Sequence, residues 1–259
     1  MWPDRVQREG AGRRRPLATA RTPAGGDGRA QGACAAGLVI PALHYGGTFD
    51  PVHAGHLAVA RAAHGTLGAD IVFLPAADPP HRPAPGASAE QRARMLELAI
   101  DGIPGYRVDR REARRPGPSY TVDTLRALRA ERGPLAPLAW LIGADAFRGL
   151  PTWHHWESLF GLAHFVVAVR PGHSLEPLPP PLAAAASGRW REAPADDSWR
   201  RSPAGQLIRL DMPLHPASAT ALRRQLGAGG DPDGWLPPAV LAYIQAQGLY
   251  RGGTAAPGV

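Results

Sequence analysis

The sequence contains no lysine, so all 29 basic residues that carry its positive charge are arginines. A Walker A phosphate loop, a Schiff-base enzyme and a ligase that forms a lysyl adenylate each depend on a lysine side chain. The absence therefore excludes these three classes in their usual forms. If this protein binds phosphate groups, we expect arginine, histidine, main-chain N–H groups and metal ions to bind them.

Cysteine and long apolar segments are also scarce. The single Cys34 cannot form an internal disulfide, which favours a reducing compartment and makes the cytoplasm the expected location. Gly, Pro, Arg or His interrupts every apolar stretch before it reaches 18 residues, so we expect no membrane span. The first residues carry arginine without the apolar run of a secretory signal.

The basic excess is concentrated near the start of the chain. A net charge of +7 over 259 residues suggests nucleic-acid binding at first sight. Residues 1–40, however, hold seven arginines against three acidic residues, so +4 of the excess lies there. We predict a disordered basic tail over 1–40, one domain over 41–251 and a second tail over 252–259. Within the domain, the proline-rich stretch 171–205 is expected to be a long surface excursion.

Short apolar runs alternate with helical patterns through the predicted domain. The runs typical of strands are residues 43–45, 71–74, 106–108, 138–142, 165–169 and 207–210. The helical patterns cover about 55–67, 88–100, 122–133, 218–227 and 238–248. This alternation predicts an α/β fold, a Rossmann-like, doubly wound and mostly parallel sheet with helices on both faces. Such sheets bind ligands at the carboxyl ends of their strands.

The first motif, Gly46-Gly-Thr-Phe-Asp-Pro-Val-His-Ala-Gly-His56, directly follows the first predicted strand. Gly46 and Gly47 permit a tight turn whose main-chain N–H groups face an anion. His53 and His56 are three apart, so they project from one side of a first helical turn. Gly55 removes a side chain where a ligand would press on the backbone. Two imidazoles at a helix N-terminus suit a triphosphate, whereas zinc would require further ligands.

The second motif, Ser218-Ala-Thr-Ala-Leu-Arg223, begins another predicted helix. Ser218 suits an N-cap, and Thr220 and Arg223 share one face of the helix. The helix start therefore offers hydroxyls, main-chain N–H groups and a guanidinium to one anionic group. A capped surface helix with a solvated arginine is the alternative, and the first motif favours the anion site.

Together these segments resemble the nucleotidylyltransferase superfamily. Residues 46–56 are similar to its T/HxGH signature. Their full sequence, GGTFDPVHAGH, is similar to that of its bacterial nicotinate-mononucleotide adenylyltransferase branch. Residues 218–223 are similar to the second signature, ISSTxxR, with Ala217 and Ala219 as departures. The resemblance spans residues 43–251 and implies that ATP and nicotinate mononucleotide give nicotinate adenine dinucleotide and pyrophosphate. It also implies Mg²⁺ as cofactor, bound through the ATP phosphates and not in a metal site of the protein.

The resemblance assigns roles to individual residues. Catalysis is implied for His53, His56 and Arg223. ATP binding is implied for Gly46, Gly47, Thr48, Phe49, Gly55, Gly143, Asp145, Ser218 and Thr220. Mononucleotide binding is implied for His81, Arg82, Tyr120, Thr121, Trp153, His154 and Arg170.

Within the mononucleotide set, main-chain N–H groups near Thr121 and His154 would meet the pyridine carboxylate. Trp153 would stack on the ring and Arg170 would meet the phosphate, although each taken alone reads as an ordinary packing or turn residue. Relatives usually carry Asn or Gln where this sequence has Ala76 and Ala77, so His81 or Arg82 is expected to compensate. The remaining histidines, including His64, His164 and His215, are interpreted as ordinary surface or core residues.

Two other functions stay open at this point. One is another adenylyltransferase of the same superfamily, acting on nicotinamide mononucleotide or on phosphopantetheine; the segments 118–121 and 151–153 argue against phosphopantetheine. The other is nucleic-acid binding by the Arg-rich tail, which we expect to be a minor possibility. Deleting residues 1–40 would then abolish salt-dependent polynucleotide binding and leave enzyme activity intact. A homo-oligomer is compatible with the sequence, and no membrane partner is expected.

Overall fold

The computed structural model describes residues 42–77, 85–115, 117–170, 175–193, 197–213, 215–230, 232 and 234–251. Both predicted tails lie outside the described residues, as does the segment 78–84 with His81 and Arg82. None of the helices in the described ranges is long and apolar enough to cross a membrane.

Seven strands of the described chain form one sheet. They are β1 (Ala42–Gly47), β2 (Asp70–Pro75), β3 (Tyr106–Val108), β4 (Ala139–Gly143), β5 (His164–Val169), β6 (Trp190–Glu192) and β7 (Leu207–Asp211). Their order is β3-β2-β1-β4-β5-β7-β6, and each pairing is parallel. The sequence order reverses direction between β1 and β4, so a ligand crevice is expected at the carboxyl ends of these two strands.

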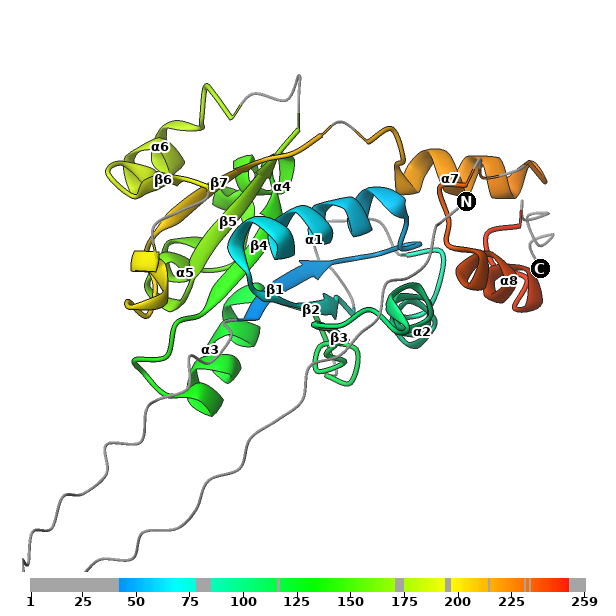
Figure 1. The fold of residues 1–259 in the computed structure, drawn as a ribbon, viewed down its shortest axis with the longest axis horizontal. Coiled ribbons are helices and arrows are strands. Elements are labelled where there is room, and N and C mark those ends of the chain that lie inside the picture. The colour runs from blue at the N-terminus through cyan, green and yellow to red at the C-terminus, as the bar shows by residue number, and fades with distance from the viewer. Residues whose placement is uncertain are drawn as a thin grey trace, which may run out of the picture. The chain divides into compact units, whose positions relative to one another are not determined.

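Helices cover both faces of the sheet (Figure 1). One face carries α1 (Ala54–Leu67), α2 (Ala89–Ile100), α7 (Ala219–Gly227) and α8 (Pro238–Ala246). The other carries α3 (Thr121–Arg132), α4 (Ala144–Arg148), α5 (Trp156–Leu162) and α6 (Pro180–Ala186). The predicted Rossmann-like, doubly wound fold is confirmed, and the sheet is entirely parallel in the described residues.

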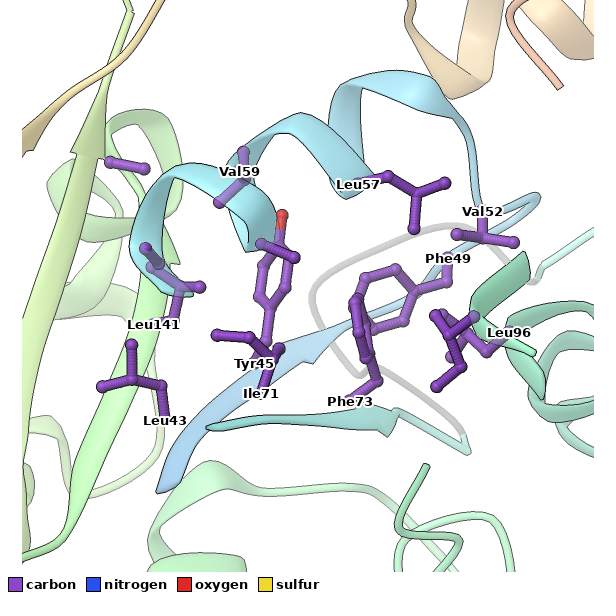
Figure 2. Packing of buried hydrophobic residues seen from close by; sticks show 14 of the residues in the cluster. Leu43, Tyr45, Phe49, Val52, Leu57, Val59, Ile71, Phe73, Leu96 and Leu141 are labelled. Atoms are coloured by element: carbon purple, nitrogen blue, oxygen red, sulfur yellow. The ribbon is translucent and has the colours of Figure 1, made fainter. Parts of the chain in front are cut away.

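Alternation along the strands separates two apolar clusters. Tyr45 and Phe73 point to the first face, where they pack with Leu57 of α1 (Figure 2). Val72 and Trp140 point to the second face, toward α3 and α5. Since successive strand residues face opposite sides, a strand buried on both faces reads as a continuous apolar run. This is why the central strands were recognisable from sequence.

Residues 171–205, which we expected to form a long surface excursion, contain regular secondary structure in their described part. Their described part contains α6, β6 and a 3-10 turn at Asp197–Arg200, and Leu182 and Trp199 are buried. Pro180 and Pro181 occupy the first turn of α6, where an N–H group has no helical partner and proline is well tolerated. The proline cluster therefore starts a helix, and β6, with the sequence Trp-Arg-Glu, has no alternating pattern.

Gly46, the last residue but one of β1, lies against the indole of Trp140. A Cβ at this position would lie 2.1 Å from Cζ2 of Trp140. We expect Gly46→Ala to lower the free energy of unfolding by about 1–3 kcal/mol through overpacking, as measured by urea denaturation. Gly65→Ala is the control, because Gly65 in α1 has open space around its Cβ position, and it should be neutral or stabilising. Equal losses in both variants would contradict the steric argument.

Candidate functional site

The loop after β1 presents two imidazoles at the start of α1. His53 is the N-cap residue, and its main-chain N–H donates to Nδ1 of His56 at 3.3 Å. The two rings stack with centroids 3.8 Å apart, so they share one side of the helix start. His53 is only 3% exposed, and its Nδ1 has no hydrogen-bond partner among the described residues. Buried polar atoms normally have partners, so this nitrogen is one of the few exceptions among the described residues.

His53 is uncharged at neutral pH. Burial is the main cause that lowers its pKa to about 4, and the positive charges of Arg170 and His215 act in the same direction. An uncharged ring can offer a hydrogen bond to an anion but no charge of its own. The shift also indicates that the residue after β5 and the loop before α7 lie within electrostatic range of His53.

Buried histidines make the stability pH-dependent. His44 in β1 donates from Nδ1 to the carbonyl of Ala139 at 3.3 Å, and burial lowers its pKa from 6.5 to about 4 as well. The unfolded chain takes up these protons near pH 6.5 and the folded chain only near pH 4. The stability is therefore fully present above about pH 6.5 and is lost as the pH falls toward 4.

We expect the free energy of unfolding to fall by about 3 kcal/mol for each of His44 and His53 between pH 7 and pH 4. Urea denaturation at a series of pH values measures this slope. His44→Gln removes one of these titrations, so its slope between pH 6.5 and 4 should be shallower. An unchanged slope in that variant would contradict the assignment.

Helix α7 brings Arg223 to the loop between β1 and α1. Nη1 of Arg223 donates to the main-chain carbonyl of Asp50 at 2.6 Å, across 173 positions of sequence. Nη2 donates to Oγ1 of Thr220 at 3.4 Å. The segment before α7 is equally close, because a Cβ at Gly55 would lie 3.1 Å from the carbonyl oxygen of Ala217. The two motifs thus adjoin each other in the fold.

Ser218 takes the capping position that the sequence predicts. It is the N-cap of α7, and its Oγ accepts a hydrogen bond from the N–H of Ala221 at 3.2 Å. The hydroxyl is therefore engaged in holding the helix start. Thr220 lies in the first turn, and both Thr220 and Ser218 are exposed to solvent.

A small hollow lies at the carboxyl ends of β4 and β5. Its lining comprises Gly143, Ala144, Asp145, Ala168 and Arg170. Because β4 pairs with β1 and β5 pairs with β4, this hollow and the histidine pair lie at the same edge of the sheet. Two predicted ATP-binding residues, Gly143 and Asp145, therefore share a site with the predicted mononucleotide residue Arg170.

The start of α3 gathers further predicted mononucleotide residues. Tyr120 is the N-cap of α3 and Thr121 is its first residue. The ring of Tyr120 lies 4.4 Å from that of His154, centroid to centroid. Trp153 is partly buried and packs against the second apolar cluster. These four residues come from two segments, which meet beside a helix N-terminus where the rings of Tyr120 and His154 approach each other.

The side chain of Phe49, one of the predicted ATP-binding residues, is buried in the first apolar cluster. It is 2% exposed, and its ring lies edge-on to Tyr45 and Phe73 with centroids 5.3 and 5.7 Å away (Figure 2). Its φ of +51° turns the chain at this point, and its ring lies beneath Gly47. Burial of an apolar ring is strongly favourable, so only the main chain of Phe49 remains for a ligand.

The motifs gave no indication of Arg92, which organises the loops of the site. Arg92 in α2 is fully buried. Its guanidinium donates to the carbonyls of Thr48, Ala76, Ala77 and Ala87 at 2.6–3.1 Å. One side chain therefore fixes the loops after β1 and β2. The available signal was an arginine on the apolar face of an amphipathic helix.

His215 and Ser119 also gain roles that the sequence did not indicate. Nδ1 of His215 accepts a hydrogen bond from the N–H of Ala217 at 3.2 Å, which orients the ring in the loop before α7. Oγ of Ser119 accepts from the N–H of Ala77 at 3.0 Å. The main chain at the two alanines that replace the usual amide side chains is thus held by Arg92 and Ser119.

Comparisons with known proteins agree with this geometry. A model of the cytidylyltransferase-like family matches residues 44–225. A Stenotrophomonas maltophilia (strain K279a) protein named "probable nicotinate-nucleotide adenylyltransferase" is 56% identical over 218 residues, covering 82% of this chain and 97% of the relative. A Xylella fastidiosa (strain M12) protein of the same name is 49% identical with the same coverage.

Solved structures show the same fold. The Plasmodium falciparum nicotinic acid mononucleotide adenylyltransferase complexed with NaAD matches with a TM-score of 0.61. The match covers 81% of this chain and 97% of that chain, at 17% identity. At this level of identity the likeness concerns the arrangement of strands and helices.

Proposed function

The chain belongs to the cytidylyltransferase-like family, and we propose that it joins ATP to nicotinate mononucleotide, giving nicotinate adenine dinucleotide and pyrophosphate. The observation that carries the proposal is the convergence of the His53–His56 pair and Arg223 on one loop. Three side chains with nitrogen donors, from two distant motifs, then adjoin one site for an anion at a helix N-terminus. The names of relatives at 49–56% identity give the same activity.

The reaction requires positioning more than proton transfer. A phosphate oxygen of the mononucleotide forms a bond to the α-phosphorus of ATP, and the bond from that phosphorus to the β-phosphate oxygen breaks. The nucleophile is already anionic, so no general base is needed. His53 and His56 donate to phosphate oxygens, and Arg223 holds the departing pyrophosphate. The positive end of the α1 dipole favours the same negative charge.

Mg²⁺ is proposed to arrive with the triphosphate. The described residues contain no group of three or more His, Cys, Asp or Glu side chains close enough to hold a metal ion. Mg²⁺ commonly takes oxygen ligands from substrate phosphates and water and few from protein. The donors present suit the phosphates that carry the ion, and when bound it would reduce the negative charge on them.

The mononucleotide is proposed to lie between the start of α3 and the end of β5. Main-chain N–H groups at Thr121 and near His154 would receive the pyridine carboxylate, since a helix N-terminus favours an anion over a neutral amide. Trp153 supplies an aromatic surface for the ring, and Arg170 supplies a guanidinium for the phosphate. The support for this placement is that all four residues lie at the carboxyl edge of the sheet.

The test offers the purified full chain ATP, Mg²⁺ and one of three acceptors, namely nicotinate mononucleotide, nicotinamide mononucleotide or phosphopantetheine. Pyrophosphate release is measured in each case. We expect kcat/KM for nicotinate mononucleotide to be at least about tenfold higher than for nicotinamide mononucleotide. This is the effect expected from one additional charge-assisted hydrogen bond. Equal rates with acid and amide would contradict the carboxylate site. Preference for phosphopantetheine, or no release with any acceptor, would contradict the function.

A further inference from the structure

The carboxylate of Asp50 joins four segments of the chain. Its Oδ2 accepts from the N–H of Gly86 at 2.8 Å, and its Oδ1 accepts from the N–H of Ala87 at 3.2 Å. The hydroxyl of Tyr250 donates to the same Oδ1 at 2.5 Å. Nη1 of Arg223 lies 3.6 Å from Oδ2. Asp50 is 6% exposed, so these contacts fix its position in the fold.

Tyr250, which follows α8, is held in an unusual conformation. Its φ of +57° lies in the left-handed region that side chains other than glycine rarely adopt. Its ring presses on Gly86, where a Cβ would lie 2.9 Å from Cε1 of Tyr250. Burial raises the pKa of the Tyr250 hydroxyl, and its hydrogen bond to Asp50 raises the pKa as well. The hydroxyl therefore stays protonated as a donor throughout the physiological pH range.

Arg223 is anchored on one side and exposed on the other. Its guanidinium is held by the main-chain oxygen of Asp50 and faces the Asp50 carboxylate, while 36% of its side chain remains exposed. A long flexible side chain loses entropy when a ligand fixes it. An arginine that is already fixed before the ligand arrives avoids most of that cost.

We propose that Tyr250 is a positioning residue, whose hydroxyl fixes Asp50 and thereby fixes Arg223 against the departing pyrophosphate. The inference rests on the role of Arg223 in the proposed function. It adds that the segment after α8 completes the site although Tyr250 itself touches no substrate. It also makes Asp50 the link through which Tyr250 positions Arg223.

The variant that tests this is Tyr250→Phe, which removes one hydroxyl and keeps the ring. We expect kcat to fall about tenfold, because one hydrogen bond to a carboxylate is lost. The KM for the mononucleotide should stay within about twofold. The proposed mononucleotide contacts lie at the start of α3 and the end of β5, so losing the bond between Tyr250 and Asp50 should not weaken mononucleotide binding. Tyr243→Phe in α8 is the matched control, because Tyr243 packs on the same apolar cluster, and it should keep normal kcat.

A double-mutant cycle separates positioning from a merely structural role. In an Arg223→Ala background, Tyr250→Phe should cost less than about twofold, because the residue that Tyr250 acts through is gone. A tenfold loss in both backgrounds would overturn the inference, and so would full activity of Tyr250→Phe in the wild-type background.

Equilibrium binding of pyrophosphate gives a readout that needs no turnover. Tyr250→Phe should weaken pyrophosphate binding about tenfold in the wild-type background and have no effect in the Arg223→Ala background. Absence of that difference overturns the inference even if the enzyme is active. Conversely, a wild-type chain that releases no pyrophosphate with any mononucleotide contradicts the proposed function, while the binding result still decides the role of Tyr250.

Discussion

His56→Ala is expected to lower kcat about 10²–10³-fold, the usual effect of removing one preorganised donor from a developing anion. Nδ1 of His56 accepts a hydrogen bond from the N–H of His53, so in the neutral ring the proton resides on Nε2. In the proposed reaction, that nitrogen donates to a phosphate oxygen. Pyrophosphate release at saturating ATP and mononucleotide measures the loss.

Two further variants sharpen the His56 experiment. His64→Ala, near the other end of α1, removes a hydrogen bond to the carbonyl of Ala69 and should leave kcat near normal. His56→Gln keeps an N–H donor at a similar reach and should recover part of the lost rate. A near-normal kcat for His56→Ala would refute the donor role.

Arg92→Met is expected to lower the free energy of unfolding by about 3–5 kcal/mol, because removing this buried charge leaves its acceptors without a donor. The four carbonyls that lose their partner belong to Thr48, Ala76, Ala77 and Ala87. Methionine retains most of the apolar packing, so the loss reports the hydrogen bonds. A domain of ordinary stability would lose a large part of its 5–15 kcal/mol.

Arg94→Met in the same helix is the matched control for Arg92. The Arg94 side chain is 52% exposed and pairs with Glu97 at 3.3 Å. An exposed pair of this kind contributes about 0–1 kcal/mol, so this variant should unfold at nearly the wild-type urea concentration. Similar midpoints for the two variants would show that the Arg92 hydrogen bonds contribute little.

The fold was predictable because most of its strands and helices can be recognised from a pattern in a few consecutive residues. A parallel strand buried on both faces is a continuous apolar run, and its connecting helix has a distinct period. β6 escaped prediction because its sequence, Trp-Arg-Glu, has two adjacent charged residues, whereas the equally short edge strand β3, Tyr-Arg-Val, alternates apolar and polar residues. α6 escaped because prolines that start a helix look the same in sequence as prolines that prevent one.

The candidate site was predictable only where its residues lie close together in one short segment of the sequence. The glycine turn and the paired histidines fall within residues 46–56, so their chemistry could be interpreted together. Asp50 lies in the same segment, but its hydroxyl partner is 200 positions away, and no periodicity links the two. Phe49 was assigned to ATP because the motif includes it, whereas the direction of its side chain depends on the tertiary core.

The bond between Tyr250 and Asp50 has a consequence for biosynthesis. During translation the first motif leaves the ribosome 200 residues before the hydroxyl that holds its carboxylate. Parallel strands can pair as they emerge, yet the arginine and the tyrosine join the nascent sheet only near the end. A growing chain is therefore expected to remain a poor catalyst until α8 and Tyr250 have docked.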